Sequence, residues 1–210
     1  MKNMAKIAIV GAGNVGGALA RLWSKAGHPV SVATRQGSPA NQIPGVSYGR
    51  AQEIAPRTEV IALAVPWPAA EEALASCGDL GGKVVIDCTN PVLPTLDGLE
   101  FGATTSAAEK LQQQALGAHV VKAFNTIGAV LLGNANFDGL QPDGYYCGDD
   151  DASKAAVIPL IAATGLRPFD VGPLRNARYL EAMAMLWIDL AVNRGRGPTF
   201  GFHTLERTQP

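Results

Sequence analysis

The sequence carries little charge. Only 17% of its 210 residues are Asp, Glu, Lys or Arg, and 17 basic residues stand against 18 acidic ones, a formal net charge of −1. A chain without an excess of basic residues has no long-range attraction for nucleic acid or for an anionic membrane surface. We therefore expect neither of these as a partner.

Cysteine is also scarce. The three cysteines, Cys77, Cys88 and Cys147, contain no Cys-x-x-Cys pair and are odd in number, which argues against a disulfide framework and a cysteine-rich metal site. No run of about 18 apolar residues is present that could cross a membrane. The apolar N-terminal stretch leads directly into a glycine motif, so it predicts a first strand and not a signal peptide. These absences predict a cytoplasmic protein.

Motifs of several enzyme classes are missing as well. The chain contains no Gly-x-Ser-x-Gly, no His-Glu-x-x-His and no Gly-x4-Gly-Lys-Ser/Thr. Asp149–Asp151 resembles a metal cluster, but acidic residues before a helical pattern are more typical of a helix N-cap. We expect no metal site.

Apolar residues (47%) and glycine (24 residues) are abundant. Short apolar runs alternate with helical patterns, which is typical of a parallel sheet covered by helices on both faces. The expected fold is α/β, a Rossmann-type doubly wound and mostly parallel sheet with a small C-terminal helical extension. The strands are expected at 6–10, 30–35, 60–66, 83–88, 119–125, 144–147 and 167–171, and the longest helix at 175–193.

The strongest local motif is Gly-x-Gly-x-x-Gly at positions 11 to 16. It follows a predicted strand and opens a predicted helix, the context in which this motif binds dinucleotides. Gly11 would make the tight turn, Gly13 would let the backbone reach a pyrophosphate, and Gly16 would let helix and strand pack closely. The pyrophosphate would lie on the N–H groups at the N-terminus of the helix.

The end of the second strand indicates which dinucleotide is bound. An acidic residue there would select the free ribose hydroxyls of NAD, but this chain has Thr34 and Arg35 and no acid before Glu53. A guanidinium and a hydroxyl suit the 2′-phosphate of NADPH. The alternative is that Arg35 is only a solvated loop residue.

Three further strand ends carry polar or small residues at the edge where open α/β sheets bind ligands. They are Val65-Pro66-Trp67, Asp87–Pro91 (which includes Asn90) and Asn125–Ala129. Together they could line a nicotinamide pocket, although each alone could be an ordinary turn.

The segments GAGNVG, Thr34-Arg35, VPW, VKAFNTIGA, CGDDDASK and GLRPFDVGPLRNARYLE occur in this order. In this the chain resembles the NADPH-dependent deazaflavin (coenzyme F420) reductase family, the F420-dependent NADP oxidoreductases. It also resembles the reductase domain of the STEAP metalloreductases. The resemblance implies an NADP-binding Rossmann domain at 1–172, a helical extension and tail at 173–210, and a homodimer.

The same resemblance implies hydride transfer between NADPH and a small-molecule redox partner, coenzyme F420 or a flavin such as FMN or FAD. Ala12, Gly13, Asn14 and Val15 would hold the pyrophosphate, and Thr34 and Arg35 the 2′-phosphate. Pro66, Trp67, Asn90 and Ala129 would flank the ribose and nicotinamide. The acceptor ring would face Asn125, Thr126, Ile127 and Gly128, and the segment Phe200–His203 would close the site. The chain departs from the family at Gln36–Ala40, which offers no further basic residue, and at Asn125 and Gly128, where archaeal members carry His and Pro.

Two other functions stay open from the sequence. One is an NADPH-dependent reductase of a small carbonyl or imine, although such enzymes carry a larger helical second domain. The other is a non-catalytic NADPH sensor that uses the exposed face of its terminal helix. Hydride transfer between stacked rings needs positioning more than proton transfer. We therefore name no general base, and Lys122, in the middle of a predicted strand, could point to either face.

Overall fold

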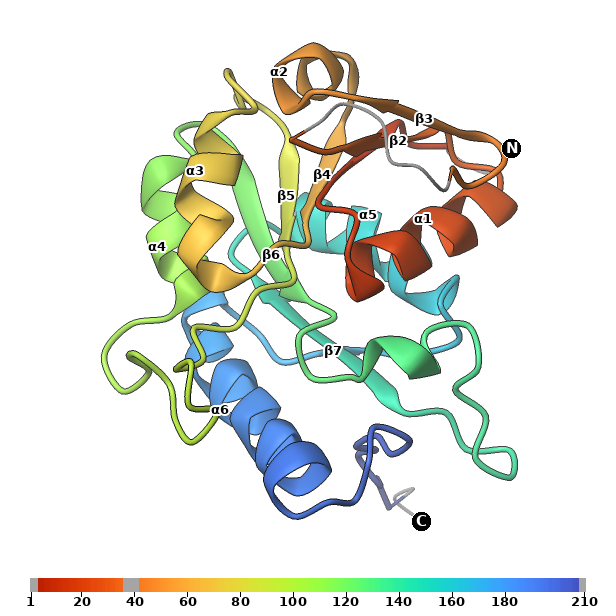
Figure 1. Cartoon of the computed structure of the whole chain (residues 1–210), viewed down its shortest axis with the longest axis vertical. Helices are drawn as coiled ribbons and strands as arrows, with labels where there is room; N and C mark the ends of the chain where they lie inside the picture. Colours follow the sequence, from red (N-terminus) through yellow and green to blue (C-terminus); the bar gives the residue numbers. More distant parts are fainter. Residues whose placement is uncertain (1–3, 36–41, 208–210) are drawn as a thin grey trace.

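One eight-stranded sheet runs through the computed structural model, which describes residues 4–35 and 42–207 (Figure 1). The strand order is β3-β2-β1-β4-β5-β6-β7-β8, so the chain reverses its winding direction between β1 and β4. Every neighbouring pair is parallel except β6 and β7. The strands are β1 (Ile7–Val10), β2 (Val30–Ala33), β3 (Val46–Gly49), β4 (Val60–Leu63), β5 (Val84–Asp87), β6 (His119–Ala123), β7 (Asp143–Gly148) and β8 (Arg167–Asp170). The doubly wound, mostly parallel Rossmann-type fold expected from the sequence is confirmed.

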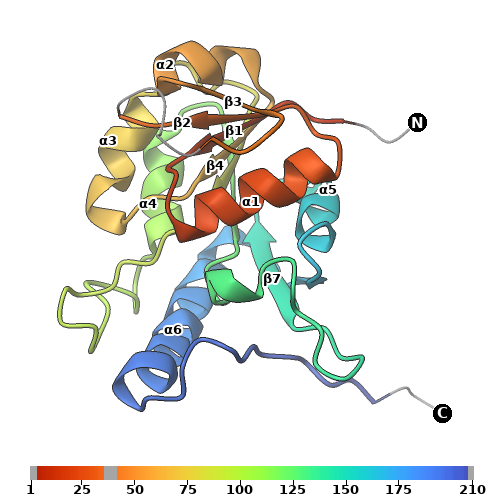
Figure 2. The same cartoon turned by 45° about the vertical axis from the view of Figure 1, so that its right-hand side comes forward.

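Helices cover both faces of this sheet (Figure 2). The first face packs against α1 (Asn14–Lys25) and α5 (Asp151–Ala162), and the second against α2 (Ala51–Ile54), α3 (Ala70–Ala75), α4 (Ala107–Gln114) and α6 (Ala177–Ile188). Successive strand residues point to opposite faces, so Ile7 and Ile9 join the first core while Ala8 and Val10 join the second. Near-continuous apolar strands are explained by this two-sided burial.

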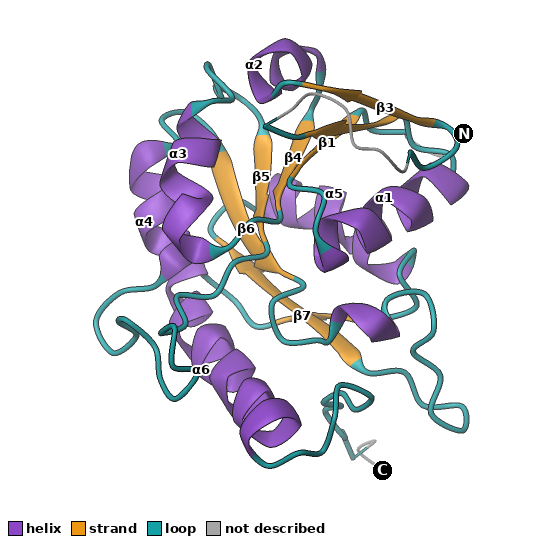
Figure 3. Cartoon of the chain, viewed as in Figure 1, coloured by secondary structure: helices purple, strands orange, loops and turns teal. Residues whose placement is uncertain are grey.

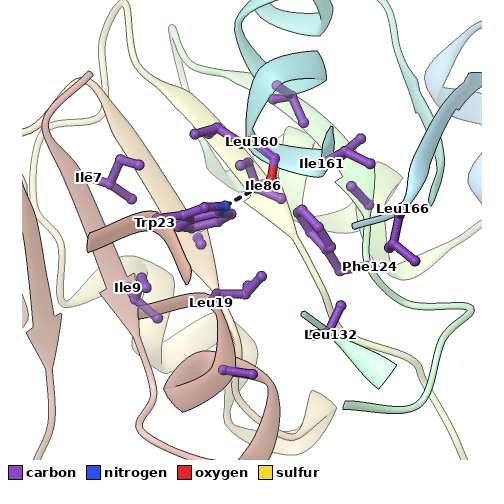
Figure 4. Close-up of a cluster of buried hydrophobic side chains, with 14 of the residues drawn as sticks. Ile7, Ile9, Leu19, Trp23, Ile86, Phe124, Leu132, Leu160, Ile161 and Leu166 are labelled. Atoms are coloured by element: carbon purple, nitrogen blue, oxygen red, sulfur yellow. Dashed lines mark hydrogen bonds between the residues drawn. The ribbon is translucent and has the colours of Figure 1, made fainter. Parts of the chain in front are cut away.

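Trp23 lies in the middle of the hydrophobic core on the first face of the sheet (Figure 4). Its indole is fully buried, donates a hydrogen bond from Nε1 to the Leu160 carbonyl at 2.9 Å, and meets the Phe124 ring edge-on at 5.8 Å. Phe124 has a φ of +64° directly after β6. The contact therefore connects α1, α5 and the carboxyl end of β6.

The helices and strands expected from the sequence are present, although their boundaries differ from those expected (Figure 3). Two short elements, β3 and α2, were not expected. The strands expected to run to Arg35 and Pro66 end at Ala33 and Leu63. β3 and α2 were not predicted, because β3 is a four-residue edge strand that is only half-buried and lacks a strong apolar pattern.

The helix expected over 175–193 is composite. A 3-10 turn (Leu174–Asn176) leads into α6, and a π-helical turn (Asp189–Asn193) follows it. The sheet is complete at Asp170, and α6 packs on α4 and β7. The domain division after residue 172 stays a prediction.

Asp150 caps α5 as expected, because its carboxylate accepts a hydrogen bond from the Ser153 N–H at 2.7 Å. Asp149 instead accepts from the Leu174 N–H at 2.8 Å. Within 4–35 and 42–207, no group of three His, Cys, Asp or Glu side chains is placed to hold a metal ion. No helix in the same ranges has the length and hydropathy needed to cross a bilayer.

Candidate cofactor site

The glycine motif forms the turn between β1 and α1. Gly11 has a φ of +109°, and a side chain there would collide with the Ala64 carbonyl on β4. A side chain at Gly16 would collide with the Gly11 carbonyl, so this glycine allows α1 to lie close to the strand end. At Gly13 no heavy atom of the described residues, apart from the glycine and its two chain neighbours, lies within 4 Å of the position a Cβ would take. The loop therefore presents bare backbone and open space at the one glycine that was predicted to approach a pyrophosphate.

A cavity of about 410 Å³ adjoins this loop. Three predicted site residues of the loop, Ala12, Gly13 and Asn14, form part of its wall, and Ala129 joins them from a short helix that packs on α1. The complete lining is Ala12, Gly13, Asn14, Gly17, Arg21, Val32, Ile43, Tyr48, Ala129 and Val130. The fold thus brings Ala129 to the loop across more than one hundred residues of sequence.

The other predicted cofactor residues lie off this lining. Gly11, Val15 and Gly16 shape the loop, and Val65 lies beside Gly11 on the neighbouring strand end. The Trp67 indole is 8% exposed, packs edge-on against Phe101 and donates to a Glu100 carboxylate oxygen at 3.1 Å. The contact of Pro66 and Trp67 with a cofactor stays a prediction.

The end of β2 carries an unpaired hydroxyl. Thr34 donates its backbone N–H to the Gly49 carbonyl at 3.2 Å, but its buried Oγ1 has no hydrogen-bond partner among the described residues. Arg35, the next residue, is exposed. The segment Gln36–Ala40 lies outside the described residues.

The ends of β5 and β6 are joined by two asparagines. Asn90 Nδ2 donates to the Asn125 carbonyl at 3.0 Å, and Asn125 Nδ2 donates to Asn90 Oδ1 at 2.9 Å and to the Leu180 carbonyl at 3.0 Å. These bonds fix the Asn125 amide, yet its buried Oδ1 has no hydrogen-bond partner within residues 4–35 and 42–207. The Oγ1 of Thr89 is unpaired as well, so in the described chain all three such buried side-chain atoms follow the carboxyl ends of β2, β5 and β6. Buried polar atoms are normally paired, and their gathering at one edge is typical of a ligand site.

Below the two asparagines lies a buried ion cluster that the sequence did not reveal. Lys122 Nζ donates to Asp87 Oδ2 at 2.8 Å, to Glu181 Oε1 at 2.8 Å and to the Thr89 carbonyl at 2.5 Å. All three ionisable side chains have no exposed surface. Glu181 also accepts from the N–H groups of Ala107 and Ala108 at the start of α4. Lys122 therefore points to the second face, where it fixes the strand ends and α6.

The buried thiols offer no nucleophile at neutral pH. Burial raises the pKa of Cys77 to about 11 and that of Cys147 to about 12. Burial also raises the pKa of Glu181, an effect that the neighbouring Lys122 ammonium opposes. Cys77 and Cys147 are consequently packing residues.

The turn Asn125–Gly128 is buried under the C-terminal segment. A side chain at Gly128 would collide with the Trp187 ring and the Pro198 carbonyl. Trp187 donates from Nε1 to the Phe200 carbonyl at 2.9 Å, and its ring stacks on Phe200 at 5.3 Å. Trp187 was missed by sequence reasoning, because its helical spacing fitted an ordinary packing face.

The segment after α6 is anchored to the start of β7. The Asp143 N–H donates to the Phe202 carbonyl at 2.8 Å, and the Thr204 N–H donates back to the Asp143 carboxylate at 2.6 Å. Figure 2 shows this segment returning from the end of α6 toward β7. The placement of Phe200–His203 is compatible with its expected role in closing the site, which stays a prediction.

Comparisons with known proteins agree with this architecture. Residues 6–91 match the family described as "NADP oxidoreductase coenzyme F420-dependent". An F420-dependent NADP reductase of Methanothermobacter marburgensis is 33% identical over 153 residues, which cover 67% of this chain and 66% of that protein. The chain belongs to the NADP-dependent oxidoreductase family. The resemblance predicted from the motifs is confirmed.

Three further proteins are similar to this oxidoreductase in sequence or in fold. The rat metalloreductase STEAP3 is 30% identical over 186 residues. The match covers 88% of this chain, but the chain spans only 37% of the length of STEAP3. A crystal structure described as an F420-dependent NADP reductase of Arthrobacter sp. FB24 superposes with a TM-score of 0.87 at 27% identity, covering 96% of this oxidoreductase and all of that chain. A reductive aminase of Aspergillus terreus shares the fold, with a TM-score of 0.67 at 20% identity over 92% of this chain and 63% of its own.

Proposed function

We propose that this oxidoreductase transfers a hydride between NADPH and a planar ring acceptor, either the deazaflavin coenzyme F420 or a flavin. One observation carries the proposal. Ala129 lines the cavity at the glycine loop, while Gly128, its neighbour, lies against the Trp187 ring. A dinucleotide cavity and a stacked aromatic pair thus meet at two consecutive residues.

The residues at the edge of the sheet fit NADPH. The open space at Gly13 and the N–H groups at the start of α1 suit a pyrophosphate. The unpaired Thr34 hydroxyl and the exposed Arg35 guanidinium suit a 2′-phosphate. The unpaired Oδ1 of Asn125 is an acceptor for the N–H₂ of a nicotinamide carboxamide.

NADPH supplies a hydride and needs no metal ion or general base for this chemistry. The protein contributes position. Asn90 and the Leu180 carbonyl hold the Asn125 amide in one orientation, and the Lys122 cluster fixes the strand ends beneath them. Holding two reactants in place lowers a barrier by as much as about 7–11 kcal/mol. We assign Asn125–Gly128 and Ala129 to ring positioning on this ground.

The acceptor is proposed from the relatives. Those from Methanothermobacter and Arthrobacter are described as F420-dependent, whereas STEAP3 is a metalloreductase of which this chain spans 37%. The stacked rings of Trp187 and Phe200 are half-buried, and they offer a flat apolar surface to a tricyclic ring. The homodimer implied by the resemblance is part of the same proposal, and light scattering on the purified protein tests it.

The test is anaerobic NADPH oxidation by the purified protein, with coenzyme F420, FMN and FAD offered separately. Calorimetric titration with NADPH runs alongside, and Gly13→Val is the control that lacks the open space at the loop. Rapid reduction of a deazaflavin or flavin by the wild type supports the proposal and names the acceptor. NADPH binding with no reduction of any of the three contradicts it and favours the sensor or the imine reductase. Absence of NADPH binding contradicts the proposal at the cofactor itself.

A further inference from the structure

Arg21 reaches the cofactor cavity from the second turn of α1. Asn14, Gly17 and Arg21 are spaced three and four residues apart, so they share one face of the helix, and all three line the cavity. Helical side chains lean toward the N-terminus of their helix. Arg21 follows this rule, because its Nη1 lies 3.6 Å from the position that a Cβ on Gly17 would take.

Gly17 makes room for this guanidinium. Outside the backbone of the helix itself, the described chain has one other atom within 4 Å of the position that a Cβ on Gly17 would take, the Ala12 carbonyl oxygen at 4.0 Å. Gly13 is open in the same way. Gly13, directly before α1, and Gly17, in its first turn, are four positions apart and leave the backbone uncovered there. The Arg21 guanidinium lies beside Gly17.

The Arg21 guanidinium has no hydrogen bond or ion pair to any residue in 4–35 or 42–207. Arg21 is also the single charged residue on the cavity lining, and no carboxylate from the described chain opposes it there. A cation beside a helix N-terminus, without a countercharge, is typical of an anion site. The cavity and the unpaired guanidinium are independent observations that indicate the same class of ligand.

We propose that Arg21 binds the 2′-phosphate of NADPH together with Arg35 and so determines specificity between NADPH and NADH. This inference rests on the proposed function. The same cavity is lined by Val32 on β2 and Tyr48 on β3, and these two residues pair in register. β2 ends in Thr34 and Arg35, where the adenosine ribose of a Rossmann dinucleotide lies. Arg21 therefore approaches the adenosine side of the cavity from α1.

The pyrophosphate has other partners. Backbone N–H groups of the glycine loop and the start of α1 already suit it. A 2′-phosphate carries close to two negative charges, and two guanidinium groups would neutralise them and donate charge-assisted hydrogen bonds. Tyr48 and Ile43, which both line the cavity, are held together by a hydrogen bond, because the Tyr48 hydroxyl accepts from the Ile43 N–H at 2.7 Å.

The test is Arg21→Gln, measured by calorimetric titration with NADPH, NADH, 2′,5′-ADP and ADP. We expect the Kd for NADPH and 2′,5′-ADP to rise about ten- to hundredfold, while NADH and ADP change less than about threefold. Arg21→Lys should retain part of the preference. Lys25→Gln is the matched control, because Lys25 lies one turn further along α1, is exposed and does not line the cavity.

Equal weakening of NADPH and NADH would assign Arg21 to the pyrophosphate and overturn the inference, as would unchanged affinity for NADPH. Thermal unfolding of each variant separates lost binding from lost structure. These failures differ from failure of the proposed function, in which the wild-type protein itself binds no NADPH or reduces no ring acceptor. Because the readout is affinity for small nucleotides, it does not depend on the identity of the acceptor.

Discussion

The Lys122 ammonium lies 2.8 Å from a carboxylate oxygen of Glu181, and neither side chain has any exposed surface. The two residues are 59 positions apart, one in the middle of β6 and the other on α6. Asp87 completes the cluster from β5. Because Leu180 also accepts from Asn125, two consecutive residues of α6 fix the strand ends that would hold the nicotinamide.

Lys122→Met should strongly destabilise the fold. It leaves Asp87 and Glu181 as buried carboxylates without their cation, a change that typically costs about 3–5 kcal/mol of unfolding free energy. Urea unfolding followed by circular dichroism measures this loss. The matched control is Lys154→Met, because Lys154 pairs with two carboxylates at the surface. We expect less than about 1 kcal/mol for the control, and equal losses in the two variants would contradict a special role for the buried cluster.

Gly13→Val should abolish dinucleotide binding without unfolding the chain. The new side chain enters open space, since no atom of another described residue beyond its chain neighbours lies within 4 Å of the Cβ position. It would nevertheless occupy the position at which a pyrophosphate approaches the backbone. Gly16→Val is the contrast, because its side chain would collide with the Gly11 carbonyl and should destabilise the fold. Calorimetric NADPH binding and thermal unfolding of both variants distinguish the two effects. Retained NADPH binding in Gly13→Val would show that the loop is only structural.

Arg35→Asp should weaken NADPH binding far more than NADH binding. The substitution replaces an exposed guanidinium with a carboxylate, which repels a 2′-phosphate and can accept hydrogen bonds from free ribose hydroxyls. We expect the ratio of the two Kd values to move toward NADH by about ten- to hundredfold. Competition titrations with the two nucleotides measure this ratio. An equal change for both would remove Arg35 from the 2′-phosphate site.

Removal of the chain after Gly197 should impair turnover with the acceptor more than NADPH affinity. The truncation deletes Phe200, which stacks on Trp187, and so exposes the ring beside Gly128. Misplaced rings transfer hydride slowly, and we expect kcat to fall about tenfold or more. Truncation after Leu205 is the control, since it keeps the Thr204 contact with Asp143. If both truncated chains turn over like the full chain, the segment has no part in the site.

Glu109→Gln should reduce stability at neutral pH but not in acid. The Arg178 guanidinium donates to both Glu109 oxygens, at 2.8 and 2.6 Å, and this lowers the pKa of Glu109 below its usual value of 4.5, although partial burial opposes the shift. The ionised form is therefore favoured by folding. Its stabilisation is complete above about pH 4.5 and disappears as the pH falls through the lowered pKa.

The pair is partly exposed, so we expect a loss of about 1 kcal/mol at pH 7 for Glu109→Gln. Urea unfolding at pH 7 and at pH 3 measures the difference from wild type, which should shrink in acid. The control is Glu72→Gln, because Glu72 is exposed in the first turn of α3 and has no such partner. A difference that grows in acid would contradict the assignment.

The sequence predicted the parts of the molecule that depend on local pattern. Buried parallel strands and the glycine loop have signatures within a few residues, and the distinct roles of Gly11 and Gly16 follow from backbone sterics alone. The Lys122 cluster could not be predicted, because its three members come from β5, β6 and α6 and meet only in the folded chain.

Arg21 and Trp187 were missed for another reason. Each sits at a helical position whose periodicity fits an ordinary solvent-exposed or packing face. Arg21 becomes distinctive only through the glycine one turn before it, and Trp187 only through the glycine of a distant turn that it covers. A basic or aromatic side chain that lies against a glycine in the folded chain cannot be recognised from the sequence pattern around it.

The antiparallel strand β7 has a consequence for the far end of the chain. The parallel strands β1 to β6 all end at the edge of the sheet where the candidate cofactor site lies. Because β7 runs antiparallel to β6, its first residue, Asp143, lies at that same edge. Thr204 is tied there. The reversal at β7, which the parallel neighbour β8 shares, gives the chain after the last helix a return path. The turn after β6 is therefore enclosed between the earliest and the latest parts of the described chain. Under the proposed function, we expect sequence changes near residue 200 to alter the acceptor side while the nucleotide side keeps its geometry.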